Sequence, residues 1–349
     1  MNFWAWLEVK GYFRPNWFHA DHDSAMLTPP NDFSSLPLKI EYNTYLADCF
    51  PKIPNFDPTT MNICNYDGQM IMNIRYVNYQ ILNDGRYYIK HPQYHIHTRN
   101  MVCTIDSSSN ESFGYKEMHE SVGELEDHNT SINGLEDIRL YVNTKGELCF
   151  VASNYNHFPE GKIQIVRGIY DIQSNICRNL CEINSPLDCY MEKNWIPIPE
   201  YASIEKTDNY DYFIYSWQPY RIGRVRHADH IGQKMPMEFV FEYENWTPRF
   251  DRVRGSSGFI KTEEGWLGVV HLSEDFCPRH YYHMLVLLDD NFAPLKYSQT
   301  FVFHNHSIEF CAAFMIKGDE YLFWISNFDK CPEYIRVKRD NIKLEYGFK

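Results

Sequence analysis

The amino-acid sequence predicts an all-β protein, and more specifically a five-bladed β-propeller. Three observations lead to this prediction: apolar runs rich in β-branched and aromatic residues, short turns rich in Gly, Asp and Asn between them, and the return of this pattern five times. Apolar residues make up 44% of the 349 residues and aromatic residues 16%, which is enough for a large core. Long stretches with helical periodicity are nearly absent.

Each repeat is expected to begin with a hairpin. The turns are centred on Gly68, Gly146, Asn209, Gly265 and Gly318. They recur at roughly fifty to eighty residues, a period typical of propeller blades with loop insertions. A β-sandwich built from the same hairpins is the alternative, and the regular spacing favours the propeller. We expect one domain over residues 1–349, in which 1–50 form an N-terminal strap or closing strand and 51–349 form the blades.

A polar or charged cluster stands before each hairpin, at the start of what would be the innermost strand. The clusters are FDPTT (56–60), LEDIR (135–139), EKNW (192–195), RGSSG (254–258) and HSIEF (306–310). In a propeller these strand starts meet at one end of the central axis. Together they would line a pocket with carboxylates, cations, amides and hydroxyls, groups that restore the hydrogen bonds a sugar loses on leaving water.

Charge and hydropathy exclude some partners. Lys and Arg number 33 against 46 Asp and Glu, a net charge of −13. A nucleic-acid binder normally shows a basic surplus, so no nucleic-acid partner is expected. The N-terminus lacks a basic leader followed by a long apolar stretch, and nowhere do about 18 apolar residues run together. We therefore expect a cytoplasmic protein without a membrane partner; the sequence does not predict its oligomeric state.

Histidines and cysteines are the candidate metal ligands of the sequence. A His-x-His pair such as His95 and His97 directs both rings to one face of a strand, which suits a metal. The sequence alone assigns no third ligand, so no metal is expected. The closest cysteines, Cys177 and Cys181, lack a second cluster for zinc and are interpreted as buried thiols. No GxGxxG or GxxxxGK[ST] loop is present, and no cofactor is expected.

The ordered motifs resemble glycoside hydrolase family 130, the five-bladed propeller enzymes that act on β-mannosides. GLEDIR is similar to the GxEDPR signature of that family, and EKNWIPI resembles a KNW-type motif. NIRYVNY, RGSSGFI with the following GWLGVVH, RHYYHMLVLLD and FWISNFD each resemble a family segment. The resemblance covers most of the chain from about residue 56 and rests on the order of the set rather than on one motif.

The resemblance implies inverting chemistry with Asp137 as the catalytic acid. Phosphate is the nucleophile in many members and water in others, and some distant relatives transfer mannose. The acid must stay protonated near neutral pH, and we expect the adjacent Glu136 to raise its pKa by like-charge repulsion. Arg139, on the same strand face, would oppose that shift or bind Glu136 or a sugar hydroxyl. A strand-start ion pair without chemistry is the alternative.

A hydrolase of this type needs a second carboxylate as the base, roughly 6.5–9.5 Å from the acid across the sugar. Glu309 and Glu192 are the first candidates, with Asp57 and Asp329 behind them. The residues expected to bind the sugar are Asp57, Arg75, Asn78, Glu136, Arg139, Asn194, Trp195 and Asp329.

Phosphate or another anion would be held by Lys193, Gln218, Arg221, Arg254, His271 and Tyr282. Lys193 and Gln218 replace arginines of the phosphorylase pattern, and Arg221 is the nearby substitute. The sequence therefore leaves open phosphorolysis, hydrolysis, transfer from an activated mannose donor, and glycan binding without turnover. The expected partner is an oligosaccharide or glycan substrate, with inorganic phosphate or a sugar-phosphate donor as the co-substrate where one is used.

Overall fold

A computed structural model describes most of the chain, and nearly all of its regular structure is β-strand. The described residues are 12–13, 36–91, 95–106, 112–121, 124–125, 131–155, 157, 162–187, 189–227, 232, 234–244, 247, 250–274, 279–304 and 308–348. The prediction of an all-β protein is confirmed, because the α-helix α2 (Ala202–Glu205) has only four residues. Within these ranges no helix has the length and apolar character that a bilayer crossing requires.

The described strands form antiparallel units that follow one another along the chain. The first unit contains β4 (Asp57–Tyr66), β5 (Gln69–Val77), β8 (Ile96–Ile105) and β9 (Ser112–Glu120). The second contains β11 (Glu136–Val142), β12 (Leu148–Asn154), β13 (Gln164–Asp171) and β14 (Ile176–Asn184). The third contains β15 (Ile196–Pro197), β16 (Tyr210–Trp217), β17 (Tyr220–Arg226) and β18 (Lys234–Tyr243).

The last two units are completed by strands from the ends of the chain. The fourth contains β19 (Val253–Thr262), β20 (Gly265–Glu274), β21 (His280–Leu288) and β22 (Pro294–Ser298), with β27 (Leu344–Gly347) paired to β22. The fifth contains β24 (Glu309–Lys317), β25 (Glu320–Asn327) and β26 (Cys331–Lys338). Its fourth strand is β3 (Tyr42–Tyr45), which comes from the beginning of the chain.

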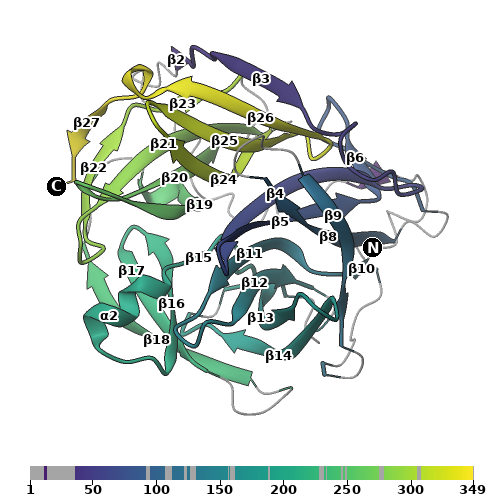
Figure 1. Cartoon of the computed structure of the whole chain (residues 1–349), viewed down its shortest axis with the longest axis horizontal. Helices are drawn as coiled ribbons and strands as arrows, with labels where there is room; N and C mark the ends of the chain where they lie inside the picture. Colours follow the sequence, from purple (N-terminus) through teal and green to yellow (C-terminus); the bar gives the residue numbers. More distant parts are fainter. Residues whose placement is uncertain are drawn as a thin grey trace.

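The first strands of the units contact one another in a ring. β4 contacts β11, β11 contacts β15, β15 contacts β19, β19 contacts β24, and β24 contacts β4. Figure 1 shows these strands nearest the centre of the molecule. Because short parallel pairings join β14 to β9 and to β18, the first three units share one continuous hydrogen-bonded sheet. The division into five separate blades therefore stays a prediction, as does the single domain.

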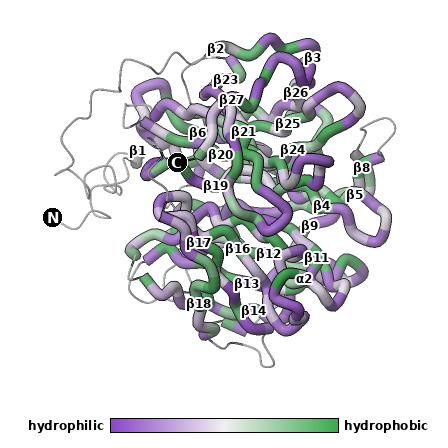
Figure 2. The backbone as a smooth tube through the Cα atoms, turned by 90° about the vertical axis from the view of Figure 1, so that its left-hand side faces the viewer, coloured by the Kyte–Doolittle hydropathy of each residue, from purple (hydrophilic) through white to green (hydrophobic). Residues whose placement is uncertain are grey.

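The core lies between successive units. Hydrophobic clusters in the described residues join the first unit to the second, the second to the third, the third to the fourth, and the fourth to the fifth. A further cluster joins the fifth unit to the first, for example Trp324 to Ile74. Figure 2 shows hydrophobic stretches along strands inside the fold and hydrophilic stretches at many outer turns. Each buried large apolar side chain contributes about 1.5–3 kcal/mol, so this packing is what holds the units together.

The predicted hairpin turns are confirmed at Gly68, Gly146, Gly265 and Gly318, which all have positive φ angles. At Gly265 a Cβ atom would lie 2.0 Å from the carbonyl oxygen of Leu288, so only glycine fits there.

The predicted tight turn at Asn209 is wrong, because η2 (Pro199–Tyr201) and α2 stand between β15 and β16. Pro197 and Pro199 lack the amide protons that a longer β15 would need, and Pro199 also suits the first turn of a helix. The two strands nevertheless pair, Ile196 opposite Ile214.

A buried ion pair joins the second unit to the third and gives a test of the packing. Arg167 Nε donates to Asp211 Oδ2 at 2.7 Å, and His227 Nε2 lies 3.2 Å from Asp211 Oδ1. We expect Asp211→Ala to lower the free energy of unfolding by about 3–5 kcal/mol, because it leaves the Arg167 guanidinium buried without its partner. Urea denaturation beside the exposed control Asp208→Ala measures this; equal stabilities would contradict it.

The same pair predicts a pH dependence. Burial alone would raise the pKa of Asp211, but Arg167 and His227 outweigh it and lower that pKa. A carboxyl with a lowered folded pKa contributes its stability above its unfolded pKa, about 3.9, and loses it as the pH falls through the folded value. The stability difference between wild type and Asp211→Ala should therefore shrink in strong acid.

Candidate functional site

The acidic pair Glu136–Asp137 opens β11 at an irregularity in the strand. The register against β12 shifts between Glu136 and Arg139, and Asp137 has a left-handed φ of 52°. Only glycine fits at position 134, just before the strand, because a Cβ atom there would lie 2.3 Å from the carbonyl oxygen of Thr98. The bulge re-aims the side chains at the strand start, as β-bulges beside active sites do.

Arg75 of β5 binds both carboxylates. Its Nη1 lies 2.8 Å from Asp137 Oδ1 and its Nη2 lies 3.3 Å from Glu136 Oε1. Lys193, just before β15, approaches the other oxygen of Glu136 at 3.3 Å. The side chains of Arg75 and Asp137 are 6% and 17% exposed, so these charges interact with little screening by water.

A third carboxylate, Asp329, is connected to the same arginine through Tyr79. Arg75 Nη2 donates to the Tyr79 hydroxyl at 3.4 Å, and that hydroxyl donates to Asp329 Oδ2 at 2.9 Å. Asp329 follows β25 and, like Asp137 and Asn194, has a left-handed backbone. Residues held in such sparsely populated conformations cluster at functional sites, and three of the predicted residues share this property here.

The expected rise in the pKa of Asp137 is wrong. Burial alone would raise that pKa, but the positive charges of Arg75, Lys193 and Arg139 outweigh it, and the pKa is lowered. Asp329 is different: burial raises its pKa, and the charge of Asp137 adds to the rise even though Arg75 opposes it. The pKa values of these two carboxyl groups are thus shifted in opposite directions.

Arg139 lies beneath the acidic pair rather than beside Glu136. Its Nη2 donates to the carbonyl oxygen of Gly255 at 3.4 Å, and its guanidinium lies over the ring of Phe310. Burial lowers the pKa of Arg139 to about 10. Together with Arg75 and Asp137 it lines a cavity of about 10 Å³, enough for a water molecule.

His271 and Tyr281 form another wall of the site. Ser256 Oγ lies 2.8 Å from His271 Nδ1, and the ring of Tyr281 stacks on the imidazole with centroids 5.4 Å apart. Burial lowers the pKa of His271 well below its usual value, and His283 with Arg139 lowers it further. His271 is therefore a neutral hydrogen-bonding group, not the cation that the sequence suggested.

The structure brings only part of the remaining predicted anion-binding set next to His271. Arg254 lies opposite His271 in the pairing of β19 with β20, and its charge helps to lower the pKa of His271. Tyr282 packs into the core between the third and fourth units and donates to Glu274 at 2.8 Å. Arg221 pairs with Glu242 of β18, so it does not substitute for the missing arginine. Arg254 Nη1 donates to backbone carbonyl oxygens at 3.0 and 3.3 Å, and Gln218 lies in the turn between β16 and β17.

The two glutamates predicted as bases both accept hydrogen bonds from neighbouring groups of the fold. Glu309 is fully buried, and its two oxygens accept the backbone amides of Phe303 and His304 at 2.8 and 2.9 Å. Glu192 accepts the Trp195 indole N–H at 3.2 Å and the Tyr215 hydroxyl at 2.7 Å. Its pKa is raised by burial.

Three of the residues predicted to bind sugar also have other partners. Trp195 is 1% exposed and belongs to the core, so its ring is not available to stack on a sugar. Asn78 is 2% exposed and hydrogen-bonds the backbone at the start of β8. Asp57 is ion-paired with Lys90 and accepts the Gln80 amide at 3.1 Å.

Sequence reasoning missed four residues whose charges or hydroxyls act on the site. They are Tyr79, Tyr87, Arg279 and Tyr281. Adjacent residues on a strand face opposite sides of the sheet, so the motif RHYYH offers Tyr281 as the alternative to Tyr282. In the pairing of β20 with β21, Tyr281 shares a face with His271 and Tyr282 lies on the other face. Tyr79 and Tyr87 come from the connection after β5, whose path no short motif predicts.

Comparisons with known proteins were made on the sequence and on the fold. No family model matches the sequence, and a search of curated proteins finds no match. The fold is similar to a β-1,2-mannobiose phosphorylase from Listeria innocua, with a TM-score of 0.52, 15% identity, and coverage of 83% of this chain and 93% of that one. A candidate glycoside hydrolase from Parabacteroides distasonis has a TM-score of 0.54 and 12% identity, with coverage of 96% and 98%.

A third solved structure, a candidate glycosidase from Bacteroides thetaiotaomicron, has a TM-score of 0.54 and 11% identity over 89% of this chain and 96% of that one. The chain thus shares its fold with a mannoside phosphorylase and with proteins named as glycosidases. The likeness to such enzymes that the sequence motifs suggested is thus confirmed at the level of an all-β fold, and the number of blades stays a prediction.

Proposed function

We propose that the chain is a five-bladed β-propeller enzyme that acts on β-mannosidic bonds with inversion. The observation that carries this proposal is the array Asp137–Arg75–Tyr79–Asp329, together with Glu136 and Lys193, at the starts and ends of inner strands. Buried, oppositely charged and left-handed residues in one place are typical of a catalytic site rather than of a fold anchor. The shared fold with a mannobiose phosphorylase supports the substrate class.

Inverting cleavage needs one carboxyl group that protonates the departing oxygen while the nucleophile attacks the opposite face of the sugar. We assign the proton donor to Asp137, as the GLEDIR resemblance implies. Arg75 keeps this carboxyl ionised without substrate. Donation therefore requires that bound sugar hydroxyls draw Arg75 away, which would let the pKa of Asp137 rise.

The opposite assignment has its own support. Asp329 has the raised pKa and Asp137 the lowered one, and such a divergence commonly separates an acid from a base. In that case Asp329 would protonate the leaving group and Asp137 would activate water. The two assignments differ in how the rates of the Asp137 and Asp329 variants should depend on the leaving group.

The nucleophile is more consistent with water than with phosphate. Arg221 and Tyr282 have partners away from the site, and His271 is uncharged. Lys193 is held by Glu136, which leaves a weak cradle for a phosphate dianion. Transfer from an activated mannose donor is the second candidate, favoured by the cations Lys193 and Arg279, whose charges both act on Tyr281.

Product analysis tests these proposals directly. A panel of β-linked manno-oligosaccharides would be incubated with water alone, with phosphate, and, for synthesis, with mannose 1-phosphate or a nucleotide-mannose donor. We expect free mannose of inverted anomeric configuration from the water arm. Mannose 1-phosphate only with phosphate would identify a phosphorylase, and chain extension only with the nucleotide donor a transferase. Absence of turnover in every arm with glycan binding retained would overturn the enzyme proposal in favour of a binding protein.

A further inference from the structure

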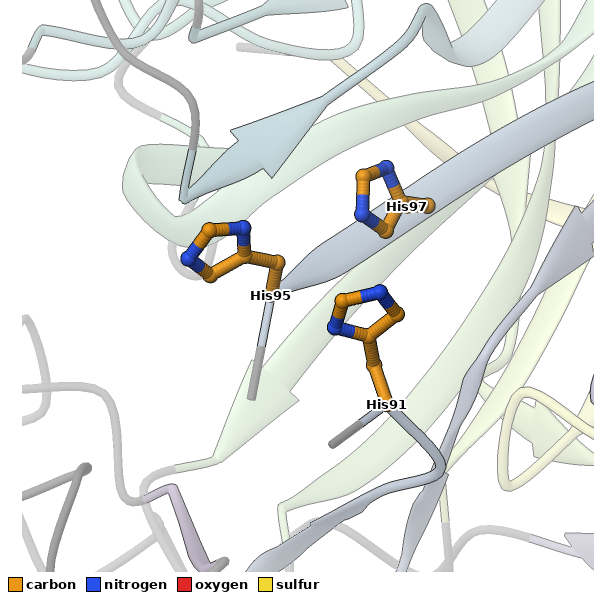
Figure 3. Close-up of side chains that lie close together, drawn as sticks. All are labelled: His91, His95 and His97. Atoms are coloured by element: carbon orange, nitrogen blue, oxygen red, sulfur yellow. The ribbon is translucent and has the colours of Figure 1, made fainter. Parts of the chain in front are cut away.

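Three histidines come together beside the first unit, outside the site described above. His91 follows the short strand β7 (Tyr87–Ile89), His95 directly precedes β8, and His97 is its second residue. Figure 3 shows the three imidazole rings arranged around a common space. The sequence indicates the His95–His97 pair but no third ligand, and the structure places His91 beside them.

The spacing of the rings suits a single ion. One ring nitrogen from each histidine lies within 4.8 Å of the other two, and the ring centroids are 5.1, 5.7 and 6.2 Å apart. Three nitrogens around a tetrahedral zinc at about 2.0–2.1 Å would stand about 3.4 Å apart. Small side-chain rotations would close that gap, and all three residues are half-buried, so an ion can reach them.

Asn78 holds this segment of the chain at both ends. Its backbone oxygen accepts the amide of Lys90 at 2.7 Å, next to His91. Its side-chain amide donates to the carbonyl oxygen of His95 at 2.8 Å, and its Oδ1 accepts the amide of His97 at 2.8 Å. Asn78 itself is 2% exposed and fixed at the end of β5. The backbone and side chain of this one buried residue thus hold the main chain beside all three histidines.

We propose that His91, His95 and His97 form a binding site for a divalent transition-metal ion, with zinc as the ion of choice and one nitrogen supplied by each ring. Imidazole is a borderline ligand that favours Zn²⁺, Cu²⁺ and Ni²⁺ over Mg²⁺ and Ca²⁺. Three histidines leave the fourth tetrahedral position for water or another ligand. This site is separate from the carboxylate array and does not depend on the proposed glycosidase function.

Metal titration of the whole chain tests the proposal. The affinity tag must be removed, since a polyhistidine tag would bind the same ions, and the protein treated with a chelator and exchanged into chelator-free buffer. Isothermal titration with Zn²⁺ is expected to give one ion per chain. Co²⁺ is expected to give the visible absorption of a four-coordinate site with nitrogen ligands. Mg²⁺ at the same concentrations is expected to give no heat.

Variants locate the ion. His95→Ala and His97→Ala should each weaken Zn²⁺ binding at least tenfold, and the matched control His119→Ala, an exposed histidine of β9, should leave it unchanged. His95→Gln keeps a polar side chain at this position, so a loss of Zn²⁺ binding in this variant is not caused by misfolding. Circular dichroism checks the fold of each variant. Asn78→Ala, which frees the segment but removes no ligand, should weaken binding about 10–100-fold and alter the Co²⁺ spectrum.

The outcomes separate cleanly. One equivalent of Zn²⁺ lost in the His95 and His97 variants, with the fold intact, supports the site. Absence of saturable Zn²⁺ binding to the tag-free wild type overturns it, as does unchanged binding in the His91→Ala, His95→Ala, His97→Ala triple variant. Loss of binding in His119→Ala with retention in the triple variant would place the ion elsewhere and would also overturn it.

Discussion

Asparagine in place of Asp137 is expected to lower kcat on an unactivated β-manno-oligosaccharide by about 10²–10⁴-fold, the range for losing a general acid or base. The amide is nearly the same size as the carboxyl, so KM should change little if substrate binding is retained. The physical reason is the position of this carboxyl, 2.8 Å from Arg75 and 17% exposed at the start of β11. Steady-state kinetics on mannobiose measures the change.

The leaving group distinguishes an acid from a base. The dinitrophenolate group of a dinitrophenyl β-mannoside departs without needing a proton. Removal of the acid should therefore slow the cleavage of that substrate little. If Asp137 is the acid, Asp137→Asn should be nearly as active as wild type on the aryl mannoside. Asp329→Asn should show no such recovery on that substrate. If Asp137 is the base, its variant should be slow on both substrates, and Asp329→Asn should recover on the aryl mannoside.

Asp340→Asn in η4 (Arg339–Asn341) is the matched control, since it makes the same chemical change at an exposed position. Its rates on both substrates should equal those of wild type. Full activity of Asp137→Asn on mannobiose would show that Asp137 serves only in a structural ion pair with Arg75. Loss of glycan affinity in that variant, with kcat unchanged, would assign Asp137 to substrate recognition.

Much of the fold could be predicted because its signals are local. A glycine at a tight turn between β-branched runs specifies a hairpin from a few residues, and the turn at Gly146 is an example. The connection from β15 to β16 could not be predicted in this way. There the prolines at 197 and 199 stop the first strand early, and the residues read as one hairpin instead form η2 and α2.

The site was less predictable, because its properties depend on partners far apart in the sequence. The motif located Asp137, but the protonation of this residue depends on Arg75, 62 positions earlier. Adjacent residues on a strand face opposite sides, so an error of one position exchanged Tyr281 for the buried Tyr282. His91 joins His95 and His97 only in the folded chain, where Asn78 hydrogen-bonds the backbone beside all three, and no spacing rule describes this arrangement.

Arg75→Met is expected to lower the free energy of unfolding substantially. This substitution keeps a long side chain and removes the guanidinium that contacts Glu136 and Asp137 and, through Tyr79, is connected to Asp329. Breaking a buried ion pair from one side costs about 3–5 kcal/mol, because the remaining charge stays buried without its partner. Urea denaturation at neutral pH measures the loss, and Arg178→Met, at an exposed position of β14, should have almost none.

The pH dependence of that loss identifies its cause. Arg75 is the largest of the charges that lower the pKa of Asp137, so this carboxyl contributes stability above its ordinary pKa of 3.8 and loses it as the pH falls through the folded value. In Arg75→Met the pKa of Asp137 should rise, because burial then acts with less opposition. The stability of the variant should therefore approach that of wild type in acid, where the carboxyls are neutral. A deficit that is the same at all pH values would mean that Arg75 acts by packing, and the electrostatic account of the site would be wrong.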